Sequence, residues 1–70
     1  MASNYKEEIV KVTKLHLEGH IEKHRMNVKI LLGSHVGVAE HPDLMETIEK
    51  ELAMMADYSD KLEMLEKYFN

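Results

Sequence analysis

Apolar residues in the first half of the chain follow two stripes with helical spacing. Both stripes alternate steps of three and four residues, the spacing by which one helix packs against another. The first stripe consists of Tyr5, Ile9, Val12, His16, Gly19, Lys23, Met26 and Ile30, and the second stripe consists of Val10, Lys14, Leu17, Ile21, His24, Val28 and Leu31. Charged residues gather on a narrow outer strip, which leaves most of the helix circumference apolar. A helix of this kind needs neighbours on two sides.

The ends of this first helix are predicted from residues that favour helix boundaries. Asn4, followed three residues later by Glu7, resembles a capping box. No proline interrupts the segment that follows, and Gly33 is typical of the position just after a helix end. The sequence therefore predicts a helix over about residues 4–32, roughly 42 Å long at about 1.5 Å per residue.

A loop over residues 33–41 and a second helix over about residues 42–68 are predicted for the rest of the chain. The glycines of the loop and the following Pro42 exclude one continuous helix. The second helix is predicted to have His41 as its N-cap and Pro42 in its first turn, where a missing N–H costs nothing. Its apolar stripe consists of Leu44, Met45, Ile48, Leu52, Met55, Tyr58, Leu62, Leu65 and Phe69.

The predicted fold is all-α, an antiparallel hairpin of two helices. Two long helices joined by a short loop pack antiparallel, but one hairpin alone would leave one stripe of the first helix in water. Two copies, with their hairpins either parallel or antiparallel, would cover it in a homodimeric four-helix bundle. The residues expected at the hairpin or dimer interface are Val10, Val12, Leu17, Gly19, Ile21, Val28, Ile48, Met55, Tyr58 and Leu62.

Gly19 occupies the middle of the predicted first helix, where glycine costs roughly 1 kcal/mol relative to alanine. We expect it to mark a close helix crossing, or to make room for a bulky neighbour such as Met55 or a histidine ring.

Charge narrows the classes of partner. The formal net charge is −4, and residues 1–41 carry six Lys/Arg against five Asp/Glu while residues 42–70 carry three against eight. A weakly basic half and an acidic half suit packing against each other. Because there is no dense basic patch, nucleic acid and anionic membranes are poor partners.

The 70-residue chain contains no cysteine, so disulfides and thiolate metal sites are excluded. Its first residues lack the apolar core of a secretory signal, and no apolar run approaches the roughly 20 residues that span a bilayer. We therefore expect a soluble, cytoplasmic protein. The serines Ser3, Ser34 and Ser59 show no pattern that would make one a nucleophile, and catalysis is not expected.

Three histidines, His16, His20 and His24, form a ridge on the first helix because they are four residues apart. Centring the hairpin on the loop places them near Tyr58, Met54/Met55 and Glu51, respectively. In the favoured interpretation His24 pairs with Glu51 and His16 bonds the Tyr58 hydroxyl, while His20 meets a water or its symmetry mate. Such buried polar groups would specify the pairing of the helices, with no cofactor.

The alternative is a metal-binding bundle that uses His16, His20, His24 and Glu51. Histidines four residues apart can present two imidazoles to one divalent transition metal such as zinc, and a dimer axis would double the ligand number. His16 and His24 are about 12 Å apart along the helix, so one ion could use only His16/His20 or His20/His24. The Glu-x-x-His element of di-metal bundles is absent from this sequence.

The segments NYKEEIVKVTKLHLEGHIEKHRMNV and VGVAEHPDLMETIEKELAMMADYSDKLEMLEKYF resemble small uncharacterised helical proteins of tailed phages of marine cyanobacteria and of ocean metagenomes. The resemblance implies a phage-encoded accessory protein in the host-cell cytoplasm, and it carries over no site residues. Together with the pattern, it leads us to expect a non-enzymatic accessory or protein-interaction module that acts as a homodimer. A further, unidentified protein partner is also possible.

Overall fold

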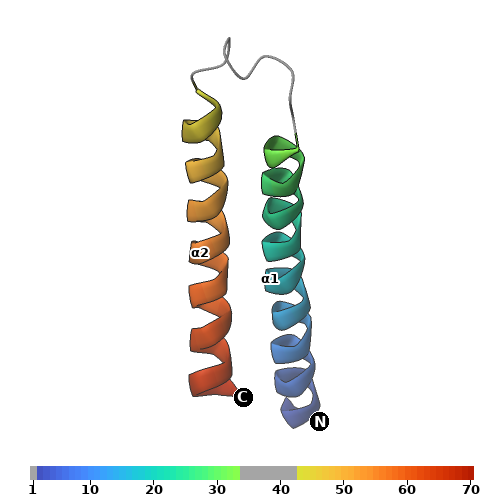
Figure 1. Cartoon of the computed structure of the whole chain (residues 1–70). Helices are drawn as coiled ribbons and strands as arrows, with labels where there is room; N and C mark the ends of the chain where they lie inside the picture. The colour runs from blue at the N-terminus through green and yellow to red at the C-terminus, as the bar shows by residue number, and fades with distance from the viewer. Residues whose placement is uncertain (1, 34–42) are drawn as a thin grey trace.

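The described part of the chain consists of two α-helices that lie side by side and run in opposite directions (Figure 1). The computed structural model describes residues 2–33 and 43–70, with side chains from residue 5 onward. Helix α1 spans Ala2–Leu32 and helix α2 spans Leu44–Phe69. The predicted all-α antiparallel hairpin is confirmed.

Helix α1 begins at Ala2, so Asn4, the predicted N-cap, lies inside the helix. At the other end, the amide of Gly33 donates to the carbonyl of Lys29 at 3.0 Å and extends the helical hydrogen bonds by one residue. The positive charge of Lys29 in this last turn is favourable at the negative end of the helix dipole.

Helix α2 begins at Leu44. The preceding Asp43 has nearly helical backbone angles (φ −83°, ψ 0°), and its side chain makes no capping hydrogen bond. Its carbonyl accepts a hydrogen bond from the amide of Thr47 at 2.8 Å, which closes the first turn. The predicted N-cap His41 and the neighbouring Pro42 lie outside the described residues.

The second stripe of α1 packs against α2 and forms the seam of the hairpin. Its buried and half-buried members are Val10, Lys14, Leu17, Ile21, His24, Val28 and Leu31 on α1, and Leu44, Ile48, Glu51, Met55, Tyr58, Leu62 and Leu65 on α2. Both sets step by three and four residues, which keeps the two helices in contact along their length. Among the described side chains, Leu17 is the one buried apolar residue, at 8% exposure. The hairpin alone therefore has little core.

The first stripe of α1 is exposed. Exposed fractions are 68% for Tyr5, 63% for Ile9 and Ile30, 56% for Val12 and 43% for Met26. These side chains lie on the same helix as the seam but are turned away from α2, because the two stripes occupy different sides of α1. One chain therefore leaves a long apolar surface uncovered.

Two residues predicted at the hairpin or dimer interface are exposed in the hairpin. Val12 and Gly19 are exposed, whereas the other eight lie in the seam. A Cβ atom added to Gly19 would have no neighbour within 4 Å, so the expected close crossing or bulky neighbour is absent within one hairpin. Gly19 belongs to the first stripe, which does not face α2, so the expected close crossing stays a prediction for the dimer interface.

Candidate functional site

The histidine ridge crosses the surface of α1 obliquely. His24 is buried in the seam at 8% exposure, His20 is half-buried and His16 is exposed. Four residues turn an α-helix by about 40° more than one full turn, so each histidine along the ridge is rotated by this amount relative to the last. The same rotation carries the ridge from the first stripe into the seam, which gives each histidine a different environment.

His24 and Glu51 form the polar centre of the seam. The Nδ1 atom of His24 bonds Glu51 Oε2, and Asn27 Nδ2 donates to Glu51 Oε1 at 3.2 Å. Both carboxylate oxygens therefore have partners, and no buried polar side-chain atom in the described residues lacks one. The hydrogen bond from His24, followed by that from Asn27, lowers the pKa of Glu51 below its usual value.

We expect Glu51→Gln to destabilise the hairpin at neutral pH and to do so less as the medium is acidified. Because the folded pKa of Glu51 lies below its ordinary value of 4.5, the unfolded chain takes up the proton first as pH falls. The stabilisation is complete above the ordinary pKa and is lost as pH falls through the folded value. Urea denaturation followed by circular dichroism between about pH 3 and pH 7 measures this change.

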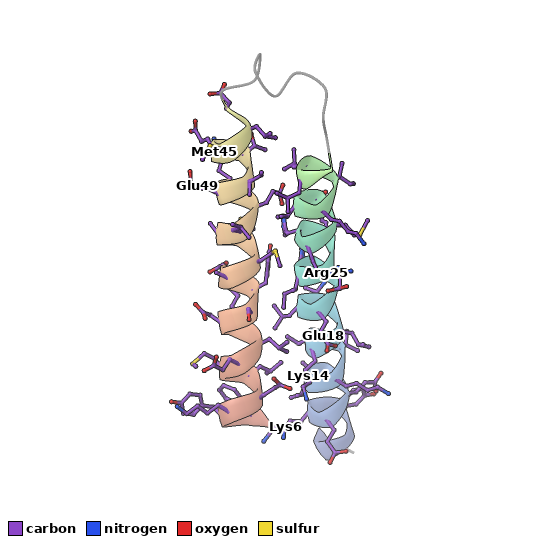
Figure 2. All side chains as sticks on the ribbon, in the orientation of Figure 1. Lys6, Lys14, Glu18, Arg25, Met45 and Glu49 are labelled. Carbon is purple, nitrogen blue, oxygen red and sulfur yellow. The ribbon has the colours of Figure 1, made fainter. Side chains whose placement is uncertain are left out.

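The matched control is Glu49→Gln, since Glu49 points away from α1 on the outer side of α2 (Figure 2). Glu49→Gln should alter stability little at any pH, because exposed charges contribute weakly. A difference between Glu51→Gln and the native chain that stays constant over the whole pH range would contradict the assigned role of the carboxylate.

Tyr58 connects the ridge to α2 through its ring. The rings of Tyr58 and His20 are stacked, with centroids 4.3 Å apart and an interplanar angle of 5°, and His24 lies nearly parallel at 5.9 Å. The register counted from the sequence, which carries a margin of about one helical turn, placed His20 near Met54/Met55; its ring partner in the structure is Tyr58, about one turn further along α2. The same register correctly placed His24 beside Glu51, so the difference arises from how the side chains of the two helices interlock.

His16 bonds its neighbour on the ridge and makes no hydrogen bond to the Tyr58 hydroxyl, which corrects the prediction. The Nε2 atoms of His16 and His20 are 3.2 Å apart, and the two rings meet edge to face at 4.6 Å. Both nitrogens belong to an exposed or half-exposed surface of α1. Of the two histidine pairs that the sequence left open, His16/His20 is the one whose ring nitrogens are within hydrogen-bonding distance.

Partial desolvation and nearby positive charge both lower the pKa of His20. Loss of hydration is the first cause that lowers its pKa, and the charges of His16, Lys23 and Lys61 act in the same direction. Lys61 in turn contacts Asp57 at 3.0 Å, and this hydrogen bond raises the pKa of Lys61. The neutral imidazole of His20 is therefore favoured at neutral pH, as a metal ligand or a hydrogen-bond acceptor requires.

The four predicted metal ligands form two separate pairs, His16 with His20 and His24 with Glu51. Among the described residues, no group of three or more His, Cys, Asp or Glu side chains is arranged to hold a metal ion. Within residues 5–33 and 43–70, one chain thus brings together two imidazole ligands at most, and Glu51 is already engaged by His24 and Asn27.

Sequence reasoning missed two contacts of the seam. Asn27 follows His24 by three residues, a spacing that places both side chains on one side of a helix, and this signal could have identified it as the second partner of Glu51. Lys14 pairs with Glu66 across the seam at 3.5 Å. The position of Lys14 in the mostly apolar second stripe could have indicated an acidic partner on α2.

Neither α1 nor α2 contains a stretch that is both long and apolar enough to cross a membrane. Comparisons with protein-family models, with curated proteins and with solved structures find no match. Function is therefore inferred from the residues and their geometry.

Proposed function

We propose that this protein is a small, non-enzymatic accessory module that acts as a homodimer, in which two hairpins form a four-helix bundle. The exposed first stripe of α1 is the observation that carries the proposal. It extends from Tyr5 to Ile30 and is more apolar than the surface of a monomeric helix needs to be. At this chain length a single core supplies roughly 3–5 kcal/mol at most, so covering the stripe adds stability that the seam lacks.

The stripe itself favours antiparallel pairing of α1 with α1 of the second copy. A twofold axis through its midpoint, between residues 17 and 18, places Tyr5 opposite Ile30 and Ile9 opposite Met26. Each of these pairs brings one exposed apolar side chain against another. The antiparallel arrangement also opposes the dipoles of the two long helices, which is favourable.

The remaining positions of the stripe fit the same arrangement. Lys23 lies opposite Val12, where its aliphatic stem can cover the valine while its ammonium group reaches water. A parallel arrangement would instead bring Lys23 against Lys23 of the second copy, two like charges in an apolar contact. Gly19 lies opposite His16, and its missing side chain leaves room for the imidazole ring.

The mass of the metal-free protein in solution tests the proposal. We expect sedimentation equilibrium in the presence of a chelator to give twice the 8.2 kDa chain mass at micromolar concentration. The mass should fall towards that of one chain only on strong dilution. A protein that stays at 8.2 kDa up to high concentration would refute the homodimer.

We expect Gly19→Leu to weaken the dimer without disturbing the hairpin. Within one chain the position is open, and leucine is a better helix former than glycine. Opposite His16 of the second copy the added bulk must be accommodated, at a typical cost of about 1–3 kcal/mol, or roughly 5- to 150-fold in dissociation constant. Sedimentation gives the constant, and circular dichroism at low concentration gives the helix content.

Glu18→Leu is the control for this substitution, because it adds leucine to the neighbouring exposed position on another side of α1. It should leave the dissociation constant nearly unchanged. If Gly19→Leu instead dimerises as tightly as the native chain, the two α1 helices do not pair around Gly19.

The resemblance to phage-encoded proteins supports a role for this module in the cytoplasm of an infected host cell.

A further inference from the structure

We infer that the dimer binds one divalent transition-metal ion, of which zinc is the reference case, through the Nε2 atoms of His16 and His20 from both copies. This site rests on the proposed homodimer, since each chain supplies only half of the ligands. It would place four imidazole nitrogens around one ion, a donor set that suits zinc and related metals.

The geometry of one chain already matches half of such a site. At Zn–N bond lengths of about 2.0–2.1 Å, two imidazole nitrogens of one tetrahedral ion lie about 3.3 Å apart. The Nε2 atoms of His16 and His20 are 3.2 Å apart. Each ring can carry its proton on Nδ1 and present an unprotonated Nε2 to the ion.

His16 and His20 also lie close to the position along α1 at which the proposed twofold axis crosses the helix. The midpoint of His16 and His20 is residue 18, and the midpoint of the first stripe lies between residues 17 and 18. The difference of half a residue is about 0.8 Å along the helix axis. The twofold axis that matches the apolar side chains of the stripe therefore brings the two histidine pairs to within about 1.5 Å of the same height, from opposite sides.

The neighbouring residues favour His16 and His20 as metal ligands over His24 and Glu51. His24 and Glu51 bond each other within the seam, and Asn27 occupies the second carboxylate oxygen. Tyr58 stacks on the ring of His20 and restricts its orientation, which is the role of a residue that positions a metal ligand. His16 is exposed in one chain, so the approach of a second copy is open.

Zinc titration of the full-length, metal-free protein tests the site. The parent chain should carry His35→Gln and His41→Gln, which remove the histidines outside the described residues. We expect isothermal titration with zinc chloride to give one zinc per two chains, and native mass spectrometry to find the ion on the dimer. His16→Gln, at an exposed position, should lower the zinc affinity by about 100-fold or more.

Further measurements separate this inference from the proposed function. His16→Gln keeps a side chain of similar length against Gly19 of the second copy, so the chelator-treated variant should still have the mass of a dimer and the native helix content. His20→Gln should lose zinc binding similarly. A dimer that binds no zinc, or binds it equally well after His16→Gln, would overturn the site and leave the homodimer standing. A chain that stays monomeric with and without zinc would overturn both. One zinc per monomer would overturn the shared site.

Discussion

Replacing Leu17 by alanine is expected to remove about 2–5 kcal/mol from the free energy of unfolding, close to the whole stability that a core of this size supplies. Leu17 is the one buried apolar side chain in the described residues, at the middle of the seam between α1 and α2. Its loss leaves a cavity that long, stiff helices cannot close by local movement. We expect the variant to be largely unfolded at micromolar concentration.

The matched control for this prediction is Leu15→Ala. Leu15 lies two residues away on the same helix but is 60% exposed, so the identical change removes little buried surface. Thermal and urea denaturation of the two variants, followed by circular dichroism, measure the difference. Equal stability of Leu17→Ala and Leu15→Ala would show that the seam is not packed as described.

The second large effect is expected from Met26→Glu, which places a charge in the first stripe. In the proposed dimer Met26 contacts Ile9 of the other copy, and symmetry introduces the substitution twice. Each carboxylate would lose water without gaining a partner, so the dissociation constant should rise at least about 100-fold, which is about 2.8 kcal/mol. Sedimentation equilibrium measures this constant directly.

Met45→Glu provides the same chemical change at a different surface. Met45 is 76% exposed and lies outside the seam with α1. Met45→Glu should leave the dimer intact, and the hairpin should keep its helix content. If Met45→Glu dissociates the dimer while Met26→Glu does not, the two copies associate through α2 and the assignment of the first stripe is wrong.

The hydrogen bonds of Glu51 and the exposed first stripe of α1 have different effects: the former favour one register of the two helices, and the latter favours association of two chains. The bonds of Glu51 to His24 and Asn27 are satisfied only when the helices meet in one register, so they favour this seam over shifted alternatives. The exposed stripe supplies apolar surface for association. The histidine ridge joins the two regions, because His24 belongs to the seam and His16 to the stripe.

Much of the architecture follows from local sequence pattern. The three-and-four spacing, the absence of proline within each helical segment and the break around Gly33 and Pro42 require two helices, and their lengths require antiparallel packing. The pairing of His24 with Glu51 was also predictable, because a carboxylate within an apolar stripe needs a partner. The helices follow from patterns within single segments, whereas the pairing also uses the register counted from the loop.

The sequence alone determined that α1 has two apolar stripes, but only the tertiary structure decided which of them faces α2. Both stripes have the same spacing, so periodicity cannot distinguish them. Packing against α2 does distinguish them. The second stripe contains Leu17 and Ile21, and its Lys14 pairs with Glu66 across the seam, whereas the first stripe is interrupted by Gly19 and Lys23. The register likewise depends on how the side chains of the two helices interlock, which is why His20 stacks on Tyr58.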